Sequence, residues 1–90
     1  MKYEAMYIVR PTLEDEARQA LVSEINGLFA TVTEVKEWGM RDLAYEIEKH
    51  KRGYYVVVVT EATTQEVAEF ERICRIREDI IRFMIVKLEE

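Results

Sequence analysis

Few side chains in this chain could do covalent or metal chemistry. His50 is the only histidine and Cys74 the only cysteine, so neither a zinc site nor a Cys/His nucleophile pair can be assembled. We expect His50 in a solvent-exposed polar turn and Cys74 buried on an apolar helical stripe. The three glycines are isolated and form no phosphate-cradling loop. The sequence therefore predicts no enzyme, no metal, no cofactor and no small-molecule substrate.

One segment combines basic, glycine and aromatic residues as nucleic-acid-binding strands do. Residues 51–57 read Lys-Arg-Gly-Tyr-Tyr-Val-Val, which loosely resembles the third strand of RNA recognition modules. Those modules stack bases on aromatic rings that point out of an open sheet. Only one of Tyr54 and Tyr55 can point outward, and the first strand offers Met6 and Ile8 there. Single-strand RNA binding of this kind remains an alternative.

The charge balance argues against a protein that binds nucleic acid unaided. The chain has 13 basic and 18 acidic residues, a net charge of -5. Phosphate affinity depends on clustered Lys and Arg. Residues 36–60 carry five basic and four acidic side chains, and residues 1–35 and 61–90 are both net acidic. We therefore expect a partner to contribute most of any phosphate contact.

Length and composition indicate one small domain over residues 1–90. A chain of 90 residues with 49% hydrophobic and 34% charged residues is typical of a folded globule. The longest apolar run, Tyr54 to Val59, is far shorter than the roughly 20 residues of a membrane helix. The single cysteine and the lack of a charged-then-apolar leader predict a cytosolic protein that is not in a membrane.

The apolar spacing predicts six elements. Residues 2–10 alternate as a strand with Tyr3, Ala5, Tyr7 and Val9 on one face. A helix should follow, with Thr12 as its N-cap. A long strand is expected from Val32 to Ile47, in which Gly39 could supply a bulge or a kink. A turn over residues 49–53 and a central strand over 54–60 should follow. Thr63 and Glu66 form the capping box of a second helix. A turn over 76–79 leads to a last strand over 80–88, in which Ile81, Phe83 and Ile85 share one face.

The order β-α-β-β-α-β predicts an α+β, ferredoxin-like domain. In this fold two helices cover one face of a four-stranded antiparallel sheet, and the first and third strands are central. The helices would then leave Met6, Ile8, Met84 and Val86 on an uncovered face. Contiguous exposed apolar surface usually marks an interaction site. The sequence thus predicts a protein partner.

Basic residues accompany this uncovered face. We expect Arg10, Arg82 and Lys2 on the outer side of two adjacent strands, where they could bind phosphates. An acylphosphatase-like enzyme has the same topology, but it would need an anion-binding loop after the first strand. Here the Arg10-Pro11-Thr12 segment leads into three acidic residues, so anion binding in that loop is not expected.

One segment of the chain reads Trp38-Gly39-Met40-Arg41-Asp42-Leu43-Ala44-Tyr45-Glu46-Ile47. It resembles ribosomal protein six of the bacterial small subunit, whose second strand carries a Gly, basic, Leu-Ala-Tyr, Ile pattern. The resemblance covers essentially the whole chain. It extends to Lys2-Tyr3-Glu4, Arg10-Pro11, Gly53-Tyr54-Tyr55, Ile76-Arg77-Glu78-Asp79, Arg82, Met84, Val86 and Lys87.

The resemblance implies a structural component of the small ribosomal subunit, in the cytoplasm, that binds the central domain of 16S rRNA together with small-subunit protein eighteen, a strongly basic partner. Family members commonly carry a longer C-terminal tail, so no tail contact is expected from Glu89-Glu90. The candidate rRNA-binding residues are Lys2, Arg10, Arg41, Arg82 and Lys87. The candidate partner-binding residues, inferred partly from strand alternation, are Met6, Ile8, Met40, Met84 and Val86. A homo-oligomeric regulatory module of the same fold remains the alternative from another class.

Overall fold

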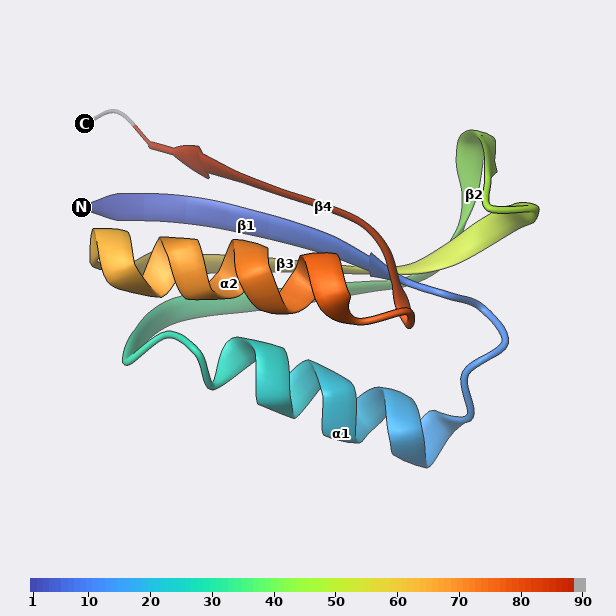
Figure 1. Cartoon of the computed structure of the whole chain (residues 1–90), viewed down its shortest axis with the longest axis horizontal. Coiled ribbons are helices and arrows are strands. Elements are labelled where there is room, and N and C mark those ends of the chain that lie inside the picture. The colour runs from blue at the N-terminus through green and yellow to red at the C-terminus, as the bar shows by residue number, and fades with distance from the viewer. Residues whose placement is uncertain (89–90) are drawn as a thin grey trace.

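The computed structural model describes residues 1–88, and the expectation for Glu89 and Glu90 lies outside them. The elements are β1 (Lys2–Val9), α1 (Asp15–Asn26), β2 (Thr31–Ile47), β3 (His50–Glu61), α2 (Thr64–Ile76) and β4 (Ile80–Lys87). The strands form one antiparallel sheet in the order β2-β3-β1-β4, with both helices on one face (Figure 1). The predicted ferredoxin-like fold, with the first and third strands central, is confirmed. No helix within residues 1–88 is long and apolar enough to span a membrane.

The core lies between the helices and the face of β1 that carries its odd-numbered residues. Ala5, Tyr7 and Val9 are fully buried, as the alternation predicts. Tyr7 donates a hydrogen bond from its hydroxyl to Asn26 Oδ1 at 2.8 Å, so the buried polar atom is satisfied by α1. Burial raises the pKa of Tyr7 well above its ordinary value. The Tyr7 ring also meets Phe70 of α2, which links both helices to the sheet.

The first helix begins later than predicted. Its N-cap is Glu14, whose side chain makes no capping hydrogen bond. Thr12 lies two residues before this N-cap, and its hydroxyl instead accepts a hydrogen bond from Arg10 Nη1 at 2.7 Å. Leu21, Val22 and Ile25 then face the core.

The second helix begins with the predicted capping box. The Glu66 amide donates to Thr63 Oγ1 at 3.1 Å, and the Thr63 amide donates to Glu66 Oε1 at 2.9 Å. The other carboxylate oxygen of Glu66 accepts from the amide of Ala30 at 2.8 Å, which ties the entry of β2 to α2. These hydrogen bonds, first the one from Thr63, lower the pKa of Glu66.

The turn between β2 and β3 is tighter than predicted. Glu48 and Lys49 both have positive φ, at 49° and 70°, and Ile47 pairs with His50. A two-residue turn of this kind suits the twist of a hairpin. The predicted turn over residues 49–53 is therefore wrong. His50 opens β3 and is half-buried, so the expected exposed turn position is wrong too.

The strand register shifts at four places, three in the pairing of β2 with β3 and one in the pairing of β1 with β4, and two of these shifts change the face of predicted residues. The predicted bulge in β2 is confirmed: the register shifts between Glu37 and Gly39, and Gly39 has a φ of 82°. A second bulge separates Ile80 from Arg82, because Val9 pairs with Ile80 and Ile8 pairs with Arg82. Strand alternation therefore fails at this end of β4.

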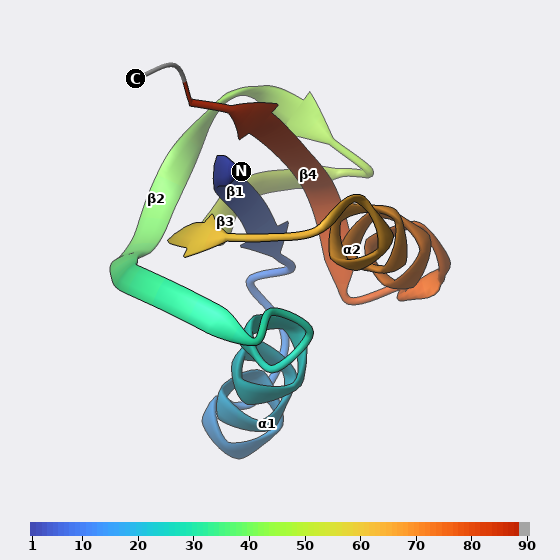
Figure 2. The ribbon, with the colours of Figure 1, turned by 90° about the vertical axis from the view of Figure 1, so that its left-hand side faces the viewer.

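The end of the β2–β3 hairpin, residues 39–53, forms an arm. Figure 2 shows β2 sweeping away from the helices and round over the other side of the sheet. The bulge at Gly39 lies where the arm begins, and bulges increase local bending and twist. The arm thus lies over part of the face that the helices leave uncovered.

Candidate functional site on the open face of the sheet

We call the side of the sheet away from the helices the open face. Its hairpin half lies beneath the arm and includes Ile8, Tyr55 and Arg82. Its terminal half lies nearer the chain ends and includes Lys2, Glu4, Met6, Met84 and Val86. Antiparallel register places Ile8 opposite both Tyr55 and Arg82, and Met6 opposite Met84.

The hairpin half is covered by the chain itself. Ile8 is only 2% exposed. A Cβ built on buried Gly53 would lie 2.2 Å from Ile8 Cγ2 and 3.6 Å from both Ile81 Cδ1 and Leu43 Cδ2. Glycine therefore lets the arm pack directly onto Ile8. The expectation that Ile8 is exposed is wrong because the arm, and not a helix, covers it.

The same close packing corrects the predicted alternation of β4. Phe83 and Ile85 pack against the core as expected. Ile81 instead lies beside Gly53 and Leu43 on the open face, because the bulge moves it to the side opposite Phe83. Ile80 takes the core position.

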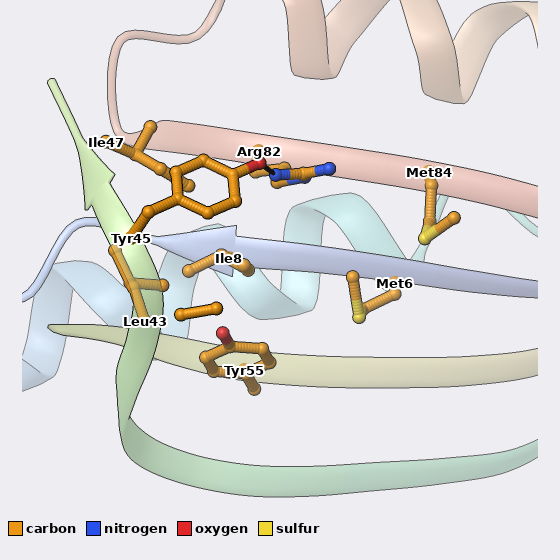
Figure 3. Close-up of a pocket in the computed structure, with 9 residues that line it drawn as sticks. Met6, Ile8, Leu43, Tyr45, Ile47, Tyr55, Arg82 and Met84 are labelled. Carbon is orange, nitrogen blue, oxygen red and sulfur yellow. Dashed lines mark hydrogen bonds between the residues drawn. The ribbon is translucent and has the colours of Figure 1, made fainter.

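A groove of about 160 Å³ remains between the arm and the sheet. In Figure 3, Tyr45 and Leu43 of the arm lie in front of the sheet, and Met6 and Met84 lie at the end of the groove away from the arm. The lining is mainly apolar, with one cation: Met6, Ile8, Leu43, Ala44, Tyr45, Ile47, Tyr55, Arg82 and Met84.

Two arginines of the hairpin half have no carboxylate partner among residues 1–88: Arg82 lines the groove, and Arg41 lies in the arm opposite Gly53. Arg82 donates to the Tyr45 hydroxyl, and its guanidinium carbon lies 5.6 Å from the centre of the Tyr45 ring. The Arg41 guanidinium lies 5.0 Å from the Trp38 ring centre, and its Nε donates to the Trp38 carbonyl at 3.4 Å. Contact with aromatic rings holds both cations while leaving their charge uncompensated.

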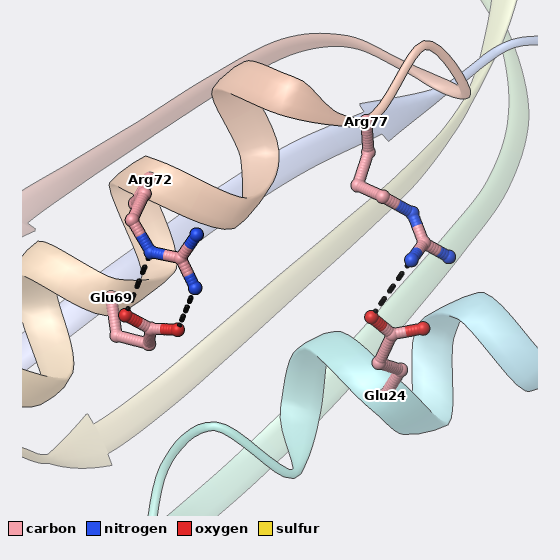
Figure 4. Close-up of polar contacts among 4 residues, drawn as sticks. All are labelled: Glu24, Glu69, Arg72 and Arg77. Atoms are coloured by element: carbon pink, nitrogen blue, oxygen red, sulfur yellow. Dashed lines mark hydrogen bonds and ion pairs between the residues drawn. The ribbon is translucent and has the colours of Figure 1, made fainter.

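Paired arginines elsewhere make a clear contrast. On the helices, Arg72 binds Glu69, and Arg77 of the loop after α2 reaches Glu24 of α1 at 3.0 Å (Figure 4). Arg72 lowers the pKa of Glu69. Ion pairs of this exposed kind contribute little to stability, but they neutralise the cations locally. Five of the arginines are paired in this way: Arg10, Arg18, Arg52, Arg72 and Arg77.

The two adjacent tyrosines of β3 point to opposite sides. Tyr55 lies on the open face, where its ring stacks on Trp38 with 6.3 Å between ring centres. Tyr54 faces the helices, donates to Glu37 Oε1 at 3.0 Å and lies 4.2 Å beneath the Arg18 guanidinium. Burial, followed by the contact with Glu37, raises the pKa of Tyr54. The base of the arm is thus fixed on both sides of the sheet.

The terminal half is not covered. Met84 is 48% and Val86 44% exposed, and Met6 beside them is half-buried. Side chains of both charges lie on this half. Glu4 and Glu34 pair in register with Val59, while Lys36 pairs in register with Val57 and its Nζ lies 3.8 Å from Glu34 Oε1. Glu4 has no ion-pair partner among residues 1–88, so the terminal half combines exposed apolar side chains with one uncompensated carboxylate.

Three predicted site residues do not gather on the open face. Arg10 lies beyond the end of β1 and binds Asp79 through its Nε at 2.6 Å. Met40 lies opposite Tyr54, on the helix side, because the bulge shifts the alternation of β2. Lys87 pairs in register with Tyr3, whose ring packs against the core, so it also lies on the helix side. The strand-parity inference for Met40 is therefore wrong.

Trp38, Leu43, Tyr45 and Tyr55 were not among the predicted site residues. Leu43, Tyr45 and Ile47 alternate along the sequence and so share one face of β2, but no local pattern indicates that the arm turns this face toward the sheet. Burial raises the pKa of Cys74 to about 12, which leaves its thiol protonated and unreactive. Within residues 1–88, no group of three His, Cys, Asp or Glu side chains could hold a metal ion.

Both the sequence and the fold of this chain are similar to those of known proteins. The family model for ribosomal protein S6 matches residues 2–87. The solved structure of 30S ribosomal protein S6 from Thermotoga maritima is similar to this chain, with a TM-score of 0.89 and 31% sequence identity over 94% of this chain and 84% of that one. Proteins of this family are structural, non-enzymatic components of the small ribosomal subunit in the cytoplasm. The chain belongs to the ribosomal protein S6 family.

Proposed function

We propose that this chain binds the central domain of 16S rRNA together with small-subunit ribosomal protein eighteen. In this proposal one half of its open face binds the protein and the other half binds the rRNA. Its family membership makes it a protein of the small ribosomal subunit. The observation that carries the finer proposal is the uneven covering of the open face. The arm covers Ile8, whereas Met84 and Val86 remain about half exposed.

The terminal half is the proposed surface for the protein partner. Met6, Met84 and Val86 supply apolar area, and Glu4, which has no ion-pair partner among the described residues, supplies negative charge beside it. Apolar contact provides most of the association energy, while complementary charge sets the orientation and speeds encounter. A strongly basic protein such as protein eighteen fits this combination. The overall charge of -5 also suppresses binding to RNA without that partner.

The hairpin half is the proposed surface for rRNA phosphates. Arg41 and Arg82 are held on aromatic rings and have no carboxylate partner among the described residues. Phosphate oxygens are strong acceptors for such guanidinium groups. Lys2 is half-buried in the terminal half, and it would contact rRNA near the partner. Arg10, already bound to Asp79, and Lys87, on the helix side, would make weaker peripheral contacts.

Filter binding of a 16S central-domain RNA fragment tests this function. The RNA would be titrated at physiological salt with this chain, with protein eighteen, and with an equimolar mixture. We expect tight binding only from the mixture, because neither surface is complete without the other. Tight binding by this chain alone would contradict the proposal. A stable homodimer at micromolar concentration in sedimentation, formed through the sheet, would favour the homo-oligomeric alternative instead.

A further inference from the structure

The groove beneath the arm has the character of a small binding site. It lies between apolar side chains of the arm and of the sheet, and Arg82 stands at its edge (Figure 3). We infer that this groove binds one unstacked nucleobase of the rRNA, with Arg82 binding the phosphate of the same nucleotide. This inference deepens the proposed function and rests on it.

The size of the groove fits one flat ring system. Its volume of about 160 Å³ is well below the roughly 300 Å³ at which sites for whole small-molecule ligands begin. Tyr45 and Tyr55 offer aromatic rings, and Met6 and Met84, which lie at the border between the two halves, offer polarizable thioethers at the end of the groove. Proteins that recognise RNA sequence commonly bind splayed-out bases against such side chains.

The charge at the groove favours a nucleotide over a side chain of the basic partner. None of the nine lining residues is a carboxylate. Arg82, the charged residue of this lining, has no acidic partner among residues 1–88, so a cationic peptide segment would bring like charge against it. A nucleotide brings the opposite charge on its phosphate. The uncompensated carboxylate of Glu4, which suits a basic protein, lies on the terminal half instead.

The four methionines of the chain provide a direct test on the purified protein. Met6 and Met84 line the groove, whereas Met40 lies on the helix side and Met1 at the N-terminus. With 13C-labelled methionine methyl groups, adenosine 5′-monophosphate would be titrated to about 10 mM. We expect a dissociation constant of about 1 mM, typical of a weak isolated contact. Ring currents of the base should shift the Met6 and Met84 signals and leave Met1 and Met40 unchanged.

Two further probes separate the base from the phosphate. Adenosine, which lacks the phosphate, should shift the same two signals with about threefold weaker affinity, as expected when one exposed charge contact is lost. Ribose 5-phosphate, which lacks the base, should cause no ring-current shift. Arg82→Gln should weaken binding of the monophosphate to the level of adenosine. Arg75→Gln, an equal change of charge at an arginine over the Phe83 ring, should leave the affinity unchanged.

Several results would overturn the inference. The first is that the Met6 and Met84 methyl signals do not shift at 10 mM nucleotide. The second is that the signals of all four methionines shift equally, and the third is that Arg82→Gln leaves the affinity for the monophosphate unchanged. Tighter binding of N-acetyltryptophanamide than of the nucleotide would assign the groove to a protein side chain. Because these measurements use the chain alone, their failure would leave the proposed function intact if the mixture with protein eighteen still binds the RNA fragment. Nucleotide binding in the groove without RNA binding by the mixture would instead contradict the proposed function.

Discussion

The two halves of the open face are built from the same strands, yet one is covered by the chain and the other is not. Ile8 and Met6 are neighbours on the same side of β1, but Ile8 is 2% exposed and Met6 lies beside Met84, which is 48% exposed. The difference comes from the arm, which begins at the Gly39 bulge and packs on Ile8 through Gly53. Strand alternation identifies which face a side chain occupies, whereas the path of a distant hairpin decides whether that face is free.

The halves also differ in charge. Arg41 and Arg82 stand on the hairpin half without carboxylate partners among the described residues, whereas Glu4 stands on the terminal half without a cationic one. One half thus suits phosphate and the other suits a basic protein. The opposite polarity gives the two proposed partners separate places on a single sheet.

The largest expected effect is on stability and separates the two halves directly. Ile8→Ala should lower the free energy of unfolding by about 3 kcal/mol, because it leaves a cavity beneath the arm. Val86→Ala should change it by less than about 0.5 kcal/mol, because this side chain is already 44% exposed. Urea unfolding of both variants measures the difference. Equal losses would mean that the terminal half is also packed by the chain.

Gly53→Ala should have the next largest effect. The new methyl group would lie 2.2 Å from Ile8 Cγ2, so the arm must move away from the sheet. We expect a loss of about 2 kcal/mol in the free energy of unfolding, the usual range for overpacking. Fluorescence of Trp38, the only tryptophan, should change in the folded state because its ring stacks on Tyr55. An unchanged spectrum with unchanged stability would show that the arm does not pack closely here.

A smaller effect is expected on binding. Arg82→Ala should reduce the slope of log affinity against log salt by about one unit for the mixture of this chain and protein eighteen on the rRNA fragment, because one phosphate contact is lost. Arg75→Ala provides the matched loss of charge on α2 and should keep the slope. A slope unchanged in Arg82→Ala would remove this arginine from the rRNA surface.

The smallest effect concerns Glu66, which lies on α2 and belongs to neither half. Its folded-state pKa is lowered below the ordinary 4.5, so its contribution is present above pH 4.5 and is lost as the pH falls through the folded-state value. Glu66→Gln should therefore be less stable than the parent chain at pH 7, and the difference should narrow at pH 3. Glu16→Gln on exposed α1 serves as control in urea unfolding at both pH values. A difference that grows on acidification would contradict the assigned hydrogen bonds.

Much of the fold was predictable from local pattern, because the signals lie within a few residues of each other. The capping box at Thr63 and Glu66, the Gly39 bulge and the inward face of β1 all follow from short-range spacing. The turn at Glu48 and Lys49 did not, because neither residue type favours positive φ. The alternation of β4 was also ambiguous, because the strand begins with two consecutive apolar residues, Ile80 and Ile81.

The candidate site was predictable only in part. Strand alternation predicts that Met6, Met84 and Arg82 share one face, and the structure places all three on the open face. The groove depends on the arm folding back over Ile8, which is a tertiary contact between residues more than 30 positions apart. No local periodicity carries that information, so Tyr45 became a candidate only through the structure, which also shows that Tyr55 and not Tyr54 is on the open face.

Hydroxyl-radical footprinting of this chain, free and bound to protein eighteen, tests the central division of the open face most directly. Oxidation of Met84 and Val86 should slow several-fold in the complex, while exposed Ile76 at the end of α2 should react at the same rate in both. That pattern is what docking on the terminal half predicts. Unchanged oxidation of Met84 and Val86 together with protection of Ile76 would place the partner on the helices and contradict the account.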